Sequence, residues 1–218
     1  MEPEAIIRTI EARVHGRYLV RVPQTEGPWP ALVSFHGYAE DASANMAALE
    51  RIPHIDGWLL VAVQALHPFY TKHERVVASW MTRQDRELAI SDNIRYVKTV
   101  VDAVRSEFMT SVPSTVFAGF SQGVAMAYRA AASVAAAGVV VLAGDVPPDV
   151  TQTLPDILIG RGRSDSWYTE ARMAADLSRL QDVAPRVETC VFDGGHEWTD
   201  EFARAVGVFL NRLPTLRP

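Results

Sequence analysis

The chain lacks several features on which whole classes of protein depend. Its 218 residues include one cysteine, Cys190, which excludes an internal disulfide and any metal site built from several cysteines. Cys190 lies in an apparent strand and is expected to be a small core residue. The sequence contains no H-E-x-x-H motif and no phosphate-binding glycine loop. We therefore expect neither a metal nor a cofactor.

Long apolar runs and basic clusters are also missing. No segment approaches the roughly 20 apolar residues that span a bilayer, and the N-terminal MEPEAIIRTIEARV carries acids where a signal peptide carries bases. A net charge of -5 without a basic cluster argues against a nucleic-acid partner. We expect a cytoplasmic protein without stable membrane insertion that acts on a small molecule, and the sequence leaves a homodimer open.

The order of apolar patterns indicates the fold class. With 48% hydrophobic residues, the chain suits a single domain over residues 1–218. From residue 30 onward, short apolar runs alternate with helical segments, and several runs end in glycine. The predicted strands are 30–37, 57–64, 114–119, 138–144, 156–162 and 186–196. This alternation predicts an α/β fold with a mostly parallel sheet, helices on both faces and no cap domain.

Two segments fall outside this alternation. Residues 10–23 are predicted to form an antiparallel pair that turns near His15 and Gly16. Residues 65–83 are mostly polar and are predicted to form a loop at the rim of the site. In open α/β sheets the ligand binds at the carboxyl ends of the strands, so we expect the functional residues there.

A serine stands between two glycines at a change from strand to helix. In TVFAGFSQGVAMAYRAA, residues 115–131, Ser121 occupies the G-x-S-x-G pattern of a nucleophile elbow. The residues before it favour a strand, and the alanine-rich residues after it favour a helix. Gly119 and Gly123 remove bulk on both sides of the turn. Ser121 is therefore the predicted nucleophile.

A serine nucleophile needs a base and a carboxylate that orients the base. His196 follows the last predicted strand, and two glycines before it allow the loop to carry the imidazole across the strand ends. Asp165 follows the run 156–162, so Ser121, Asp165 and His196 come in the chain order of α/β hydrolases. Asp145, one strand earlier, is the alternative acid.

An oxyanion hole requires two backbone N–H groups aimed at the reacting carbonyl oxygen. The amide of Gln122, at the start of the helix after the serine, is expected to supply one of them. The amide of Tyr38 is expected to supply the other, because Gly37 before it allows the backbone to approach closely.

With these residues in place, the chain resembles the phospholipase/carboxylesterase family of small α/β hydrolases, which includes the acyl-protein thioesterases. HGYAED, AGFSQGVAMAYRAA and FDGGHEW are similar to its oxyanion, nucleophile and histidine blocks, and GRGRSD occupies the place of its acid block. The similarity covers about residues 30–213. The family often carries Trp-Phe-Asp before the long helix, where this chain has Ser-Trp-Met-Thr at residues 79–82.

The motifs and the resemblance predict a serine esterase that hydrolyses short-to-medium chain carboxylic esters through an acyl-enzyme. The same machinery serves an acyl-protein thioesterase or a lysophospholipase, and these remain alternatives. A binding module that keeps the fold without catalysis is the alternative from another class. Three tryptophans in loops near the predicted site are expected to line the substrate pocket: Trp80, Trp167 and Trp198.

Overall fold

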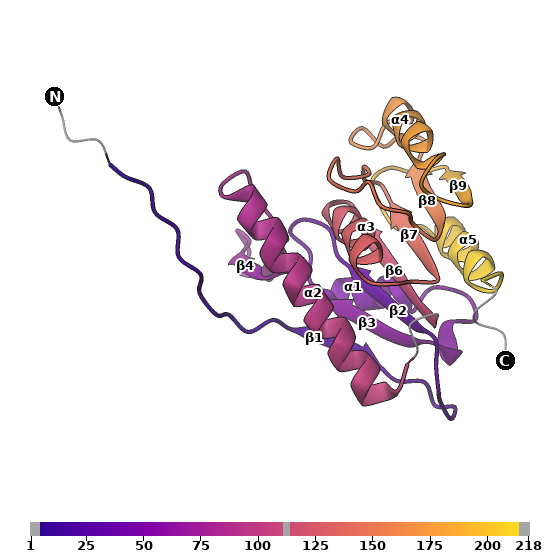
Figure 1. Cartoon of the computed structure of the whole chain (residues 1–218). Coiled ribbons are helices and arrows are strands. Elements are labelled where there is room, and N and C mark those ends of the chain that lie inside the picture. The colour runs from indigo at the N-terminus through magenta and orange to yellow at the C-terminus, as the bar shows by residue number, and fades with distance from the viewer. Residues whose placement is uncertain (1–4, 111–113, 214–218) are drawn as a thin grey trace.

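The chain folds around a seven-stranded sheet in the order β1-β3-β2-β6-β7-β8-β9 (Figure 1). The computed structural model describes residues 5–110 and 114–213. Among the described strands of this sheet, neighbours run parallel except β1, which pairs antiparallel with β3. The elements are β1 (Tyr18–Arg21), β2 (Ala31–Phe35), α1 (Ala42–Leu49), the 3-10 helix η1 (Ile55–Gly57), β3 (Leu59–Val63), β4 (His67–Tyr70), β5 (Val76–Ser79), α2 (Arg86–Phe108), β6 (Thr115–Phe120), α3 (Gln122–Ser133), β7 (Gly138–Leu142), β8 (Asp156–Gly162), α4 (Glu170–Leu180), β9 (Val187–Phe192) and α5 (Asp200–Leu210).

The central strands are buried along their whole length. Every residue of β2, β3, β6 and β7 is buried, so side chains on both faces of the sheet are covered. Such coverage explains why these strands are continuous apolar runs rather than alternating ones. Helices α2 and α3 pack against each other, and α5 packs on the turn that follows α1, where a Cβ on Gly207 would lie 2.9 Å from the Pro53 carbonyl oxygen. The predicted α/β fold is confirmed.

One predicted helix is absent from the connection between two parallel strands. Residues 143–155, between β7 and β8, form no regular element, although a helix was expected between each pair of runs. Val146, Val150 and Leu154 are each at most 5% exposed and fix this segment against the protein. The segment also carries Asp145 past the carboxyl end of β7.

Residues 65–83 are not the irregular loop that was predicted. Strands β4 and β5 form a separate antiparallel hairpin within this segment. Its second strand also pairs with the loop after β2: the Ala78 N–H donates to the Glu40 carbonyl at 2.8 Å, and the Ala39 N–H donates to the Ala78 carbonyl at 3.1 Å. The strands were missed because each is four residues long and exposed polar residues separate them.

The predicted N-terminal antiparallel pair is wrong. Residues 5–17 contain no regular element, and the start of this segment extends away from the body of the molecule (Figure 1). Its end lies on the protein, where the Arg17 carbonyl accepts from the Gln64 amide at 2.9 Å and from the Tyr96 hydroxyl at 2.7 Å. The strand begins after the expected turn, at Tyr18, and its partner is β3 rather than the preceding residues. Ile10 is 93% exposed and Val14 is 65% exposed, so the alternation that suggested a strand covers no apolar surface.

Candidate active site

The turn between β6 and α3 holds Ser121 in an uncommon backbone conformation. Its φ is 51° and its ψ is -116°, a region where a residue other than glycine is strained. A Cβ on Gly123 would lie 2.1 Å from the Phe35 carbonyl oxygen, and one on Gly119 would lie 2.4 Å from the Gly123 carbonyl oxygen. Both glycines are therefore required by close backbone approach, as the sequence predicts.

Three predicted side chains meet at the carboxyl ends of the strands. His196 Nε2 lies 2.7 Å from Ser121 Oγ, and His196 Nδ1 lies 2.9 Å from Asp165 Oδ2. A carboxylate only accepts hydrogen bonds, so Nδ1 carries the proton and Nε2 accepts from the serine hydroxyl. The Phe120 ring packs on the imidazole with ring centroids 5.1 Å apart. This geometry suits proton transfer from the hydroxyl to Nε2.

The carboxylate of Asp165 is buried and fully hydrogen-bonded. Its Oδ1 accepts from the Trp167 and Tyr168 amides at 2.8 and 2.9 Å, while Oδ2 faces His196. Burial alone would raise the pKa of Asp165, but the bonds from the Tyr168 amide, His196 and the Trp167 amide outweigh it, so the pKa lies below its usual value. Asp165 therefore stays ionised beside the imidazole.

The alternative acid is engaged elsewhere. Asp145 Oδ2 accepts a hydrogen bond from Arg172 Nη1 at 2.9 Å, and both side chains are about half exposed. The structure brings Asp165, and not Asp145, into contact with His196. Asp165 reaches His196 because β8 pairs with β9, so the loops that follow these two strands lie side by side. The Ser164 amide, next to Asp165, donates to the Gly194 carbonyl, two residues before His196, at 2.9 Å.

The two predicted oxyanion donors lie on adjoining segments. The contact between Gly123 and the Phe35 carbonyl brings the start of α3 against the end of β2, and Tyr38 follows in the loop after β2. Within the described part of the chain, the amides of Tyr38 and Gln122 donate no hydrogen bond to another protein group. The Tyr38 side chain is 59% exposed. Both N–H groups are therefore available to a bound oxygen.

The loop that carries Tyr38 is held from both sides. The Gly37 amide donates to Glu40 Oε2 at 2.7 Å, and burial raises the pKa of this Glu40 carboxyl. His36 Nε2 accepts from the Ala65 amide at 3.0 Å, so its Nδ1 donates to the Gly37 carbonyl at 2.7 Å. Burial lowers the pKa of His36, which keeps this structural imidazole neutral.

The side chain of Gln122 has a role that the sequence did not reveal. Its Oε1 accepts from the Trp80 amide at 2.8 Å, and its Nε2 donates to the Met81 carbonyl at 2.9 Å. The Trp80 indole in turn donates to the His36 carbonyl at 2.8 Å. Gln122 thus fixes the segment after β5 against the elbow. The only sequence feature that could have indicated this role is the position of the glutamine directly after the serine.

Trp80 does not line the pocket, so that expectation is wrong. Its side chain is fully buried and packs edge-on against Phe35 with ring centroids 5.5 Å apart. Trp198 is half-buried against Phe202 and does not line the cavity beside the serine. Trp167 does line it and is 72% exposed. Of the three tryptophans, one lies where substrate would bind.

The cavity beside Ser121 has a volume of about 460 Å³, and His196 also lines it. Three arginines that the sequence analysis did not single out also line it: Arg83, Arg86 and Arg172. For Arg86 the sequence contained one indication: it stands at the start of α2, where the helix dipole disfavours a cation. Arg83 and Arg172 gave none, since an exposed arginine in a loop or helix is ordinary.

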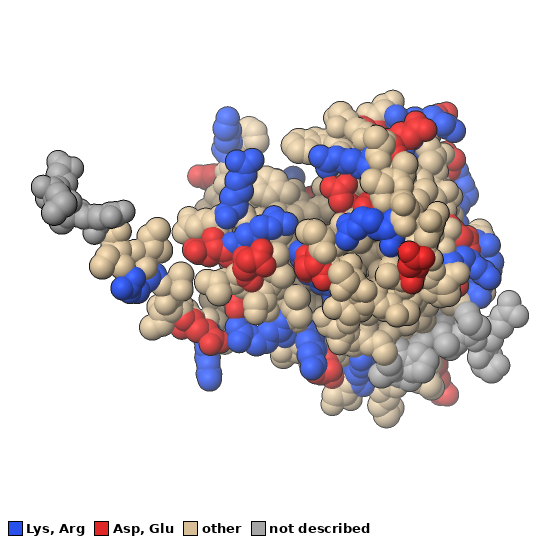
Figure 2. All heavy atoms as spheres, turned by 45° about the horizontal axis from the view of Figure 1, so that its top comes forward, with Lys and Arg blue, Asp and Glu red and all other residues tan. Residues whose placement is uncertain are grey.

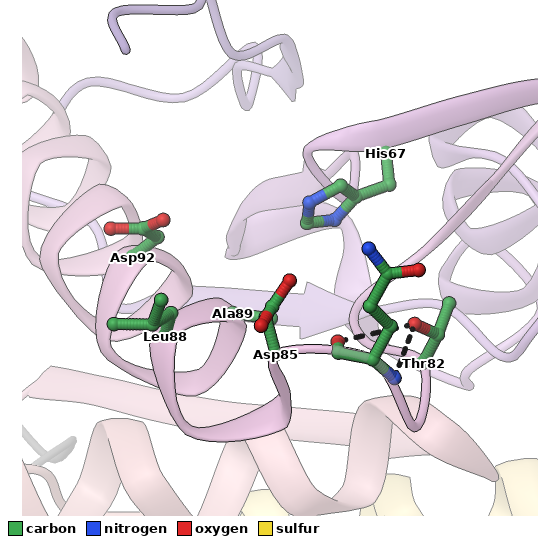
Figure 3. Close-up of a pocket in the computed structure, with 7 residues that line it drawn as sticks. His67, Thr82, Asp85, Leu88, Ala89 and Asp92 are labelled. Carbon is green, nitrogen blue, oxygen red and sulfur yellow. Dashed lines mark hydrogen bonds between the residues drawn. The ribbon is translucent and has the colours of Figure 1, made fainter. Parts of the chain in front are cut away.

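A second hollow, of about 300 Å³, lies at the start of α2 (Figure 3). His67 from β4 and the carboxylates of Asp85 and Asp92 border it, and none of the candidate catalytic residues does. Thr82 borders both this hollow and the cavity beside the serine. Over the described residues, no group of three or more acidic, histidine or cysteine side chains could hold a metal ion.

The described helices include none that is both long enough and apolar enough to cross a membrane. The longest, α2, has 23 residues, and charged side chains recur along it. Each of its buried residues lies three or four positions from another, which places them on one face, as in a helix that packs on a protein core.

The sheet order and the Ser121, His196 and Asp165 contacts are features of the α/β-hydrolase class. Neither a protein-family model nor a curated protein matches the sequence. Solved structures do match. A carboxylesterase from Mesorhizobium loti superposes with a TM-score of 0.77 at 18% identity, over 90% of this chain and 95% of that one.

Two further structures bear on the resemblance of the motifs. A Bacillus cereus carboxylesterase has a TM-score of 0.76 at 14% identity, over 91% of this chain and 94% of that one. A phospholipase/carboxylesterase from Dyadobacter fermentans has a TM-score of 0.67 at 21% identity, over 91% and 97%. The Dyadobacter protein carries the name of the family that the sequence motifs resemble, and the Bacillus protein carries part of it. At such identities they establish the α/β-hydrolase fold.

Proposed function

We propose that this protein is a serine esterase that hydrolyses short-to-medium chain carboxylic esters. The observation that carries the proposal is the continuous contact from Ser121 Oγ through His196 to the buried Asp165, at 2.7 and 2.9 Å. An exposed serine is weakly nucleophilic unless a base takes its proton. The fold neighbours named carboxylesterase support the same class of reaction.

In the proposed reaction, Ser121 Oγ attacks the ester carbonyl while His196 Nε2 takes the hydroxyl proton. Asp165 holds the imidazole in the required tautomer and stabilises its cationic form. The negative charge that develops on the carbonyl oxygen is received by the amides of Tyr38 and Gln122. His196 then gives the proton to the leaving alcohol, and an acyl-enzyme remains.

Water completes the cycle by the same steps. His196 takes a proton from the water as its oxygen attacks the acyl carbon, and the proton passes to Ser121 Oγ as the acid leaves. The exposed Trp167 and the segment that ends at Pro148 line the cavity where the ester would lie. A cavity of about 460 Å³ open to solvent suits a small ester better than a long acyl chain.

The nucleophile is tested with an active-site probe. A fluorophosphonate should label the protein at Ser121 alone, and Ser121→Ala should lose the labelling and more than 99% of nitrophenyl acetate turnover. A matched control is Ser164→Ala, since this exposed serine lies directly before Asp165 and, among the described residues, only its amide makes a hydrogen bond. Turnover above a few per cent in Ser121→Ala would refute the assignment.

A further inference from the structure

The cavity beside the serine contains uncompensated positive charge. Apart from His196, its charged lining consists of three arginines and Asp145. Asp145 and Arg172 form an ion pair at 2.9 Å and neutralise each other. Arg83 and Arg86 make no ion pair within 4.0 Å and no hydrogen bond to any residue of 5–110 or 114–213. Two cations therefore face the space that also contains the nucleophile.

The position of Arg86 opposes the stability of its own helix. It is the first residue of α2, where the helix dipole favours acidic side chains and disfavours cations. Arg86 acts electrostatically on Asp149, but Arg129 already occupies both oxygens of that carboxylate at 2.8 Å. No ion pair or hydrogen bond within residues 5–110 and 114–213 therefore accounts for the cation. A residue that contradicts local preference at the edge of a site indicates a role in binding.

The positive charge is local to the cavity. The whole chain carries a net charge of -5, and Figure 2 shows basic and acidic side chains interspersed over one face, without a large area of one sign. General attraction of anions to the protein is therefore weak. An anion would therefore bind favourably only in the cavity that Arg83 and Arg86 line. There, the two N–H groups of a guanidinium match the two oxygens of a carboxylate.

We infer, on the basis of the proposed esterase function, that the substrate is an ester that carries a carboxylate, which Arg83 and Arg86 bind while Ser121 attacks the ester carbonyl. Apolar lining residues such as Met81 and Pro148 would cover the methylene groups between the two ends. The arginines act here as specificity-determining residues and take no part in bond making.

Matched pairs of esters test the charge preference in a titration assay. Monomethyl glutarate and methyl pentanoate differ only in a carboxylate on the acyl part. 4-Acetoxybutyrate and butyl acetate differ only in a carboxylate on the alcohol part. In at least one pair, the charged ester should have a kcat/KM about tenfold to a hundredfold above its neutral partner. The preference should shrink in 0.5 M NaCl, because salt screens exposed charges.

Variants identify the cause of the preference. In the double variant Arg83→Gln/Arg86→Gln, the ratio of charged to neutral kcat/KM should fall to near one. Arg204→Gln is the matched control, because Arg204 is exposed on α5 and does not line the cavity. It should keep the ratio of the wild type. Turnover without preference for the charged ester in either pair, or a preference that survives in the double variant, would overturn the inference and leave the esterase function standing.

A binding measurement covers the case in which none of the esters is turned over. Absence of turnover would count against the proposed function, whereas the anion site can be followed in the inactive Ser121→Ala protein. Monomethyl glutarate should raise its unfolding temperature more than methyl pentanoate does, and Arg83→Gln/Arg86→Gln should remove the difference. Equal shifts for the two ligands would overturn the anion site, whatever the activity.

Discussion

Replacement of Gln122 by leucine separates the structural role of its side chain from the role of its backbone amide. The side chain satisfies the Trp80 N–H at 2.8 Å and the Met81 carbonyl at 2.9 Å. Trp80 is fully buried and Met81 is 5% exposed, so water cannot readily replace these bonds. An unsatisfied buried backbone group costs about 1–3 kcal/mol. The Met81 carbonyl still accepts from the Ser79 hydroxyl at 2.8 Å. The Trp80 amide alone is therefore left without a partner, which predicts a loss of about 2 kcal/mol in the free energy of unfolding.

Urea and thermal unfolding measure this loss. For a chain of this length, 1 kcal/mol corresponds to about 2–4 °C, so Gln122→Leu should lower the Tm by about 4–8 °C. Gln181→Leu is the matched control, since Gln181 is exposed at the end of α4 and its side chain makes no bond within the described chain. It should change the stability by less than about 0.5 kcal/mol. A loss below about 1 kcal/mol in Gln122→Leu would refute the reasoning.

Three further predictions concern the acid, the oxyanion loop and the substrate. Asp165→Asn should lower kcat about a thousandfold or more, and Asp145→Asn much less; the reverse order in steady-state kinetics would assign the acid to Asp145. Burial raises the pKa of Glu40, so its ionisation above about pH 4.5 destabilises the folded wild type. The variant Glu40→Gln keeps an acceptor for the Gly37 amide but cannot ionise. Its free energy of unfolding, relative to that of the wild type, should therefore increase as pH rises; a constant difference from pH 4 to 8 would contradict this. On nitrophenyl esters, kcat/KM should peak between about C2 and C6 and fall by C12, because an open cavity gives no added burial to each further methylene; a maximum at C12 would favour the lysophospholipase or thioesterase alternative.

The sequence predicted those parts of the molecule that local pattern determines. Buried parallel strands need uninterrupted apolar residues, so their order along the chain indicated the sheet. The elbow was readable because Gly119 and Gly123 are required by backbone contact at 2.4 and 2.1 Å. From these, the places of Ser121, Asp165 and His196 followed, since parallel strands bring their carboxyl ends to one edge.

Features that depend on contacts between distant segments were not predictable in this way. The buried indole of Trp80 donates to the carbonyl of His36, 44 residues earlier, and nothing in the sequence near the tryptophan indicates this contact. The connection of residues 143–155 carries scattered apolar residues whose partners lie in other elements, so it resembled a short helix. Strands β4 and β5 are four residues each, and their pairing with the loop after β2 supplies order that neither has alone.

The pairing of β5 with the loop after β2 makes the hairpin part of the mechanical support of the Tyr38 amide. A two-stranded hairpin is only marginally stable by itself, and its tip, around Lys72 and Glu74, is exposed. Local opening of the hairpin would release Ala39 and Glu40 from Ala78 while the seven-stranded sheet stays folded. Inactivation on warming should then precede global melting, and a protease that nicks the hairpin tip should abolish turnover in a protein that still gives the circular dichroism of the native fold.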